Sequence, residues 1–327
     1  MERLPNTDHL RQILKSYSAE VDGILGVAIC DRNGFIIASD FKEGDEEESD
    51  SIIGAISAIL DNYIDRIKSE FGSKGNFFNI TMTGEKKFAF CSQGPLSILT
   101  TVADQTTSDI ELKVYSEHIA GKIELILDGN NDVSPKVSEI IRALAKTRAG
   151  SLQNITGKFS HKLILTGDYQ VGKTSLIRRF VKNTFEKDYI STMGVQISKK
   201  EVSLTEKTHM NFILWDIGGQ VQQMAPYRAK FYNGANAAFI VIDRTREDNL
   251  NSIKRWYKDI KNSIPKNIPI VLVGNKSDLI DDIIISEEDI RKAADDLGFH
   301  YILTSAKTGE NVNDAFLYIA YRVIETL

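Results

Sequence analysis

Cysteine is scarce in this chain of 327 residues, which has two, Cys30 and Cys91, both within apolar runs typical of strands. Two thiols in a chain of this length argue against a disulfide framework and a structural zinc site, and they favour a reducing compartment. The five histidines are scattered along the chain, so the sequence predicts no metal cluster built on them.

Long apolar runs and basic stripes are also missing. No run approaches the 18 residues of a membrane span, and the N-terminal stretch MERLPNTDHL lacks the apolar core of a signal peptide. Residues 1–128 hold 12 basic and 22 acidic side chains, whereas residues 129–327 hold 28 and 23. Because nucleic acid needs a basic surface, the acidic half is a poor candidate for binding it. We expect a cytoplasmic, soluble protein without a nucleic-acid partner.

The length and the apolar fraction of 42% indicate two globular domains. We expect one domain at residues 1–128, a linker at 129–159 and a second domain at 160–327. In the linker, Ser134-Pro135 predicts the start of a basic helix with an apolar stripe formed by Val137, Ile140, Ile141, Leu144 and Ala145. A helix with such a stripe needs a surface to pack on, so we expect it to dock on one of the two domains.

The first half predicts a helix at 7–21, a hairpin turning at Asn33-Gly34, a long helix at 51–71, three further strands and a last helix at 108–127. This order, together with the GVAICD segment and the central helix, resembles the roadblock family. The resemblance implies a five-stranded antiparallel α+β domain that dimerises through Ile52–Ile67 or pairs with another roadblock protein. A profilin-like or longin-like sheet is the competing fold, and Ile52–Ile67 as core alone is the competing role.

The second half opens on a phosphate-binding pattern. The apolar run HKLILTG precedes GDYQVGKTS, residues 167–175, which leads into a helix. This strand–loop–helix context predicts a Walker A loop whose backbone N–H groups at 168–173 cradle a β-phosphate. Lys173 would bridge the β- and γ-phosphates, and the Thr174 hydroxyl would hold Mg²⁺.

Three later motifs indicate guanine nucleotide. Asp216 and Gly219, in WDIGGQ, follow a strand. Asp216 would hold Mg²⁺ through water, and the Gly219 N–H would contact the γ-phosphate. NKSD at 275–278 follows another strand, and the Asp278 carboxylate can accept from the two donors that guanine presents and adenine lacks. The SAK segment at 305–307 would complete the base pocket.

Together these motifs make residues 160–327 resemble a Ras-superfamily small GTPase, closest to Rab-like members. The resemblance implies an α/β fold with a mixed six-stranded sheet flanked by five helices, bound GTP or GDP, and Mg²⁺. It assigns Thr192 to the first switch, Phe185 to packing on the base and Gln220 to positioning water. Trp215 and Tyr232 match surface aromatics of Rab-like proteins, with burial in the core as the alternative.

The resemblance therefore predicts the whole site. The catalytic residues would be Lys173, Thr192 and Gln220, and the metal ligands Thr174, Thr192 and Asp216. The nucleotide-binding residues would be Gly167, Asp168, Tyr169, Gln170, Val171, Gly172, Lys173, Thr174, Ser175, Phe185, Gly219, Asn275, Lys276, Asp278, Ser305, Ala306 and Lys307.

Four departures from the family pattern bear on turnover. Tyr169 is a bulky side chain at a position where bulk commonly hinders the catalytic glutamine, here Gln220, and the arginine inserted by an activating protein. Gly218 stands where the family has an alanine, and Val221 stands where it has a glutamate. No arginine precedes Thr192 within the switch. We expect a switch that hydrolyses GTP slowly and uses GTPase-activating and exchange proteins, with a GTP-binding scaffold that seldom hydrolyses as the alternative. No lipidation motif is present at either end, so we expect no direct lipid anchor.

Overall fold

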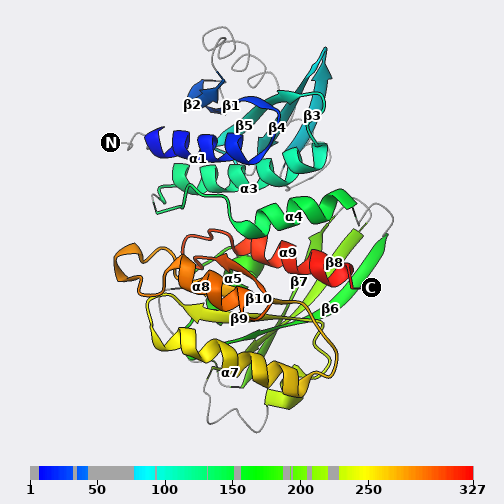
Figure 1. Cartoon of the computed structure of the whole chain (residues 1–327), viewed down its shortest axis with the longest axis vertical. Coiled ribbons are helices and arrows are strands. Elements are labelled where there is room, and N and C mark those ends of the chain that lie inside the picture. The colour runs from blue at the N-terminus through cyan, green and yellow to red at the C-terminus, as the bar shows by residue number, and fades with distance from the viewer. Residues whose placement is uncertain are drawn as a thin grey trace. The chain divides into compact units, whose positions relative to one another are not determined.

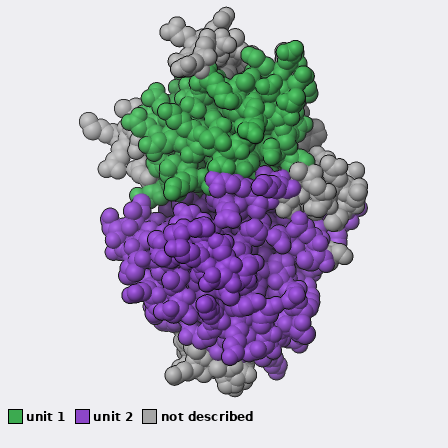
Figure 2. All heavy atoms as spheres, viewed as in Figure 1, with its two compact units in different colours: residues 1–137 green, residues 138–327 purple. Residues whose placement is uncertain are grey.

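This computed structural model describes residues 7–31, 35–42, 77–92, 94–130, 132–150, 156–186, 192, 194–204, 208–219 and 228–326. The chain divides into two compact units, residues 1–137 and 138–327 (Figure 2). The three-part division at residues 128 and 159 stays a prediction.

The first unit carries a five-stranded sheet in the order β2-β1-β5-β4-β3, and every neighbouring pair is antiparallel. This agrees with the antiparallel sheet expected from the sequence. Its elements are α1 (Thr7–Glu20), β1 (Ile24–Asp31), β2 (Ile36–Phe41), β3 (Phe77–Thr83), β4 (Lys86–Ser92), β5 (Ser97–Asp104) and α3 (Asp109–Leu127). The predicted turn at Asn33-Gly34 and the predicted central helix at 51–71, with Ile52–Ile67, lie outside the described residues.

Two local signals explain α1 and α3, the described helices of this unit. The apolar positions of α1 face inward, and Ser108 caps α3 by accepting a 3.3 Å hydrogen bond from the Glu111 backbone N–H.

Cys30 in β1 and Cys91 in β4 are buried thiols, and burial raises the pKa of Cys91.

The predicted linker helix starts later than Ser134-Pro135 indicated. Helix α4 spans Glu139–Gly150. The buried ammonium of Lys122 donates to the carbonyl oxygens of Ser134 and Lys136, each at 2.7 Å, so these carbonyls have partners other than those a helix would give them. The prediction of a helix start at Ser134 is therefore wrong. The apolar stripe is buried as expected, and within the second unit α4 packs against α9 (Val312–Ile324) and β11 (His300–Leu303).

The second unit is an α/β fold (Figure 1). Its mixed six-stranded sheet has the order β11-β10-β9-β6-β8-β7. Strand β7 is antiparallel to β8, and the other neighbouring pairs are parallel. Besides α4, β11 and α9, its elements are β6 (Gly157–Thr166), α5 (Lys173–Lys182), β7 (Val195–Ser203), β8 (Thr208–Ile217), β9 (Ala237–Asp243), α7 (Asp248–Ser263), β10 (Ile270–Asn275), the 3₁₀ turn η1 (Ile280–Asp282) and α8 (Glu287–Asp295).

Helices cover both faces of this sheet. On one face α7 and α8 pack with a hydrophobic cluster that includes Ile240, Ile253 and Trp256. On the other face α5 and α9 bring Phe180 and Phe316 into stacked contact at 3.8 Å between ring centroids. None of the helices in the described ranges combines the length and apolarity that a bilayer crossing requires.

Candidate nucleotide site

The site lies at the edge of the sheet where the parallel strands end, the usual ligand position in such folds. Its first part is the loop between β6 and α5. Gly172 has φ of +97°, and a Cβ there would lie 2.2 Å from Asn275 Nδ2, so a glycine is required. Gln170 is exposed and has φ of +64° although it carries a side chain. This left-handed conformation is disfavoured for a residue with a Cβ, so the surrounding contacts must hold it.

Lys173 begins α5 with its ammonium buried under the loop. Its Nζ donates to the carbonyl oxygens of Gly167 at 2.9 Å and Asp168 at 2.7 Å. Burial lowers the pKa of Lys173 to about 8, against the opposing effect of the Asp216 and Asp168 carboxylates. A buried cation needs compensating negative charge, which a nucleotide's phosphates would supply.

The side-chain oxygens of the three predicted metal ligands lie close together beside Lys173. Thr174 Oγ1 donates to Asp216 Oδ2 at 2.5 Å and lies 2.9 Å from Thr192 Oγ1. Thr192 Oγ1 is 3.5 Å from the same carboxylate oxygen. Burial raises the pKa of Asp216, and its Oδ1 is buried without a hydrogen-bond partner.

An all-oxygen cluster with an unsatisfied buried carboxylate oxygen suits Mg²⁺, which prefers oxygen ligands. The residues therefore fit the ion that the sequence implies. When bound, Mg²⁺ would neutralise charge on the phosphates. Thr174, Thr192 and Asp216 would hold it from α5, the segment before β7, and β8.

At the other end, Asn275 ties three segments together. Its Nδ2 donates to Val171 O at 2.9 Å, and its Oδ1 accepts from the Ala306 backbone at 3.2 Å. Ser305 Oγ donates to Asp278 Oδ1 at 2.6 Å, and Lys307 lies 3.5 Å from Asp278 Oδ2. The carboxylate is thereby oriented and balanced by charge at the end expected to receive the base.

One cavity of about 530 Å³ joins the two ends. This volume is in the range of small-molecule sites. The predicted residues that line it are Tyr169, Gln170, Gly172, Lys173, Thr174, Ser175, Phe185, Thr192, Gly219, Asn275, Lys276, Asp278, Ala306 and Lys307.

The other predicted residues that are described do not line the cavity, and most of them bond to residues that do. Gly167 and Val171 provide carbonyl oxygens to Lys173 and Asn275, and Ser305 orients Asp278. Asp216 holds Thr174, and the Asp168 side chain is directed to α7. Gln220, with Val221 after it, lies outside the described residues.

Gly219 is pressed against the phosphate-binding loop. A Cβ at this position would lie 2.4 Å from Asp168 O and 2.6 Å from Tyr169 N. The neighbouring departure, Gly218, is equally confined, since a Cβ there would lie 2.8 Å from Thr192 O. The alanine of the family pattern has no room at 218 in this arrangement.

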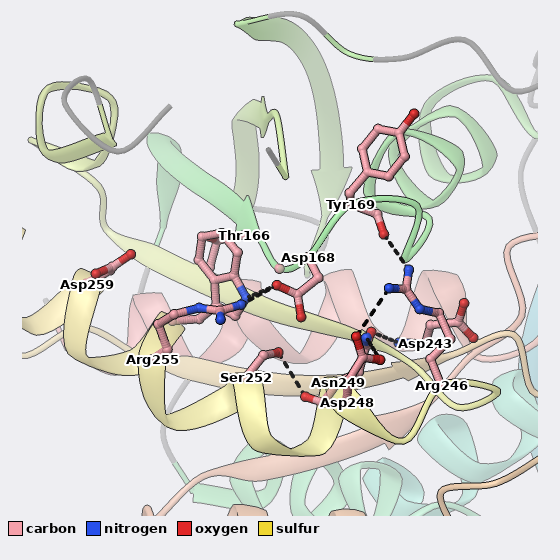
Figure 3. Close-up of polar contacts among 12 residues, drawn as sticks. Thr166, Asp168, Tyr169, Asp243, Arg246, Asp248, Asn249, Ser252, Arg255 and Asp259 are labelled. Atoms are coloured by element: carbon pink, nitrogen blue, oxygen red, sulfur yellow. Dashed lines mark hydrogen bonds and ion pairs between the residues drawn. The ribbon is translucent and has the colours of Figure 1, made fainter. Parts of the chain in front are cut away.

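Sequence reasoning missed two arginines that line the cavity. Arg178 forms an ion pair with Glu186 at 2.9 Å, and it stands four residues after Thr174, a spacing that places both on one helix face. Arg246, after the end of β9, donates to Tyr169 O at 2.9 Å (Figure 3). No motif marks Arg246; only its place after a parallel strand could have pointed to it.

Tyr232 and Trp215, the two aromatic residues expected near the switches, differ in how deeply they are buried. Tyr232 is fully buried and its hydroxyl is 2.6 Å from Thr166 Oγ1, so the core alternative holds for it. Trp215 is half-buried, with Lys162 Nζ 3.6 Å from its ring centroid.

Comparison with known proteins agrees with this geometry. The Ras family model matches residues 162–325, which is half of the chain. The chain belongs to the Ras family. As a Ras-family small GTPase it binds GTP and GDP with Mg²⁺, hydrolyses GTP, and falls in a class regulated by GTPase-activating and exchange proteins.

Its relatives include Rab proteins. The human Ras-related protein Rab-22A is 35% identical over 165 residues, which is 50% of this chain and 84% of that protein. The dog Rab-22A is 36% identical over 164 residues, 50% of this chain and 82% of that protein. The GTP-binding protein ypt1 of Schizosaccharomyces pombe is 35% identical over 166 residues, 51% of this chain and 81% of that protein.

Proposed function

We propose that this chain is a guanine-nucleotide switch that hydrolyses GTP slowly and carries a roadblock-like platform for dimerisation or regulation. The observation that carries the switch is the single cavity joining Lys173 and Thr174 at one end to Asn275 and Asp278 at the other. In this proposal Lys173 neutralises the phosphates, Thr174, Thr192 and Asp216 hold Mg²⁺, and Asp278 selects guanine.

Slow hydrolysis is supported by the surroundings of Gly219. Tyr169 lines the cavity, and its backbone nitrogen lies 2.6 Å from where a Cβ of Gly219 would be. Gly219 directly precedes Gln220, which we propose to position the attacking water. Tyr169 therefore lies next to Gly219, the residue that directly precedes the proposed water-positioning glutamine.

The pairing of the two arginines in the described part of the cavity lining supports slow turnover too. Within the described residues that line the cavity, Arg178 is paired with Glu186 and Arg246 with the Tyr169 carbonyl. An arginine supplied at the γ-phosphate is worth roughly 10³–10⁵ in rate. An activating partner that brings one would convert the slow switch into a fast one.

The platform proposal rests on the first unit's five-stranded antiparallel sheet and its order of elements. A platform fused to the GTPase would raise the effective concentration of the two modules to about the millimolar range. The alternative function, a GTP-binding scaffold with little hydrolysis, is favoured by the same bulky residue, Tyr169.

Extraction of the bound nucleotide, followed by single-turnover hydrolysis of [γ-³²P]GTP, tests the proposal. We expect guanine nucleotide in the extract and measurable release of phosphate that depends on Gln220, with Gln220→Leu inactive. Adenine nucleotide would refute the assignment of the base. Hydrolysis at the rate of GTP in buffer would favour the scaffold instead.

A further inference from the structure

Two residues of the phosphate-binding loop, Asp168 and Tyr169, are held by side chains from α7 and from the segment before it. Figure 3 shows donors from α7 and the segment before it directed at Asp168 and Tyr169. Arg246 Nη1 donates to Tyr169 O at 2.9 Å. Trp256 Nε1 donates to Asp168 Oδ1 at 3.2 Å, and Arg255 forms an ion pair with the same oxygen.

Several backbone carbonyl oxygens of the phosphate-binding loop accept hydrogen bonds from side chains, and the contact from Arg246 is one of these. The carbonyl oxygens of residues 167 and 168 accept from Lys173, and that of Val171 accepts from Asn275. The carbonyl oxygen of Tyr169, which lies between them in the loop, accepts from Arg246. Each of these four carbonyl oxygens therefore accepts a hydrogen bond from a side-chain donor.

The orientation of a carbonyl determines the orientation of the next N–H. In a trans peptide the C=O and the following N–H point in opposite directions. With the Tyr169 oxygen held by Arg246, the Gln170 N–H is directed to the opposite side of the loop, and Gln170 lines the nucleotide cavity. Backbone N–H groups of such loops are the donors that hold phosphate.

This peptide needs an external support because its second residue is strained. Gln170 has φ of +64°, a left-handed conformation that a glycine adopts readily and a glutamine does not. A peptide free to relax would lower that strain by rotating, and the Gln170 N–H would leave the phosphate position.

We propose that Arg246 is a positioning residue that holds the Tyr169–Gln170 peptide in the orientation required to bind the nucleotide's phosphates. The inference rests on the proposed nucleotide site. It assigns retention of nucleotide partly to a side chain outside the four guanine-nucleotide motifs.

The test measures release of a fluorescent GDP, N-methylanthraniloyl-GDP, from the full-length protein after excess unlabelled GDP is added. Arg246→Met removes the donor, and we expect release about tenfold faster, the effect of losing one charge-assisted hydrogen bond. Arg246→Lys keeps a cationic donor and should release within about threefold of the wild type. Arg291→Met is the matched control, because Arg291 pairs with Glu288 and Asp295 on α8 and does not line the cavity.

A double mutant distinguishes positioning from simple charge. Gln170→Gly removes the strain, so in that background Arg246→Met should accelerate release less than about threefold, which is a coupling between the two sites. An equal acceleration in both backgrounds, or release at the wild-type rate in Arg246→Met, would overturn the proposal. If the methionine variant does not fold, Arg246→Ala, which also removes the donor, gives the same comparison in the two backgrounds.

The outcome also separates this inference from the proposed function. If the wild-type protein fails to bind the labelled GDP, the nucleotide site itself is wrong. If it binds and retains the label but Arg246→Met behaves like Arg291→Met, the site stands and the positioning role falls.

Discussion

At the scale of single residues, the hydrogen bonds made by neighbouring side chains fix the positions of the residues that line the site. Asp278 is oriented by Ser305 at 2.6 Å, and its side chain is 5% exposed. Tyr169, by contrast, lines the cavity with its backbone held by Arg246, and Figure 3 shows its ring directed away from that contact.

Asp278→Asn should weaken the binding of GDP by about a hundredfold, because a carboxylate that accepts two hydrogen bonds is replaced by an amide that cannot accept both. Xanthosine diphosphate, whose base has a carbonyl where guanine has the amine, should bind the variant better than GDP does. Competition against labelled nucleotide measures both. Unchanged preference for guanine would remove Asp278 from the base site.

Tyr169→Gly should raise the single-turnover rate of GTP hydrolysis about tenfold, since removing bulk beside Gly219 lets the Gln220 segment approach the phosphates. Tyr169→Phe keeps the ring and should hydrolyse at the wild-type rate. Phosphate release from preloaded protein is the measurement. If the glycine variant is no faster, obstruction by this side chain is not the cause of slow turnover.

At the scale of elements, helix α4 belongs to the packing of the GTPase unit. Its buried residues include Ile140, Ile141 and Leu144, and it contacts α9 and β11. A fragment that begins at residue 155 would remove this cover from α9 and β11. Biochemical work on the isolated GTPase should therefore begin at residue 138, where the compact unit begins.

Leu144→Ala should lower the free energy of unfolding by about 2–5 kcal/mol, the range for truncating a fully buried leucine. Lys146→Ala, on the exposed side of the same helix, should change it by no more than about 0.5 kcal/mol. Chemical denaturation of the full-length protein, followed with saturating GDP and Mg²⁺, measures both. Equal effects of the two variants would show that α4 is not part of the cooperative unit.

At the scale of the whole molecule, the two units have separate sheets and separate proposed tasks. The first is the proposed platform, and the second holds the nucleotide cavity. Because a change in one module can alter the other only through a coupling free energy, regulation within the chain is measurable by removing one of them.

We expect the full-length protein to be a dimer in light scattering and the fragment 138–327 to be a monomer. Their single-turnover hydrolysis rates should differ about fivefold or more, a typical size for coupling between sites. Equal rates would count against regulation by the first unit, and a monomeric full-length protein would count against dimerisation. A tenfold range of protein concentration controls for weak association.

Sequence reasoning anticipated most of the second unit because its motifs stand at the ends of strands. Lys173, Thr174, Asn275 and Asp278 line one cavity, as their order along the chain predicted. It misplaced the start of α4, because the Lys122 ammonium that binds the preceding carbonyls comes from α3. The site prediction also left out Arg246, which belongs to no motif.

By itself the sequence determined the nucleotide chemistry, because phosphate loops and guanine motifs are local patterns whose residue types are required by the ligand. It also determined the order of elements, since hydrophobic periodicity reports which face of each element is buried. Only the tertiary structure decided what holds the left-handed Gln170 in place and what α4 packs on. Those contacts join residues far apart in the chain, such as Tyr169 and Arg246, and no local pattern encodes such a pairing.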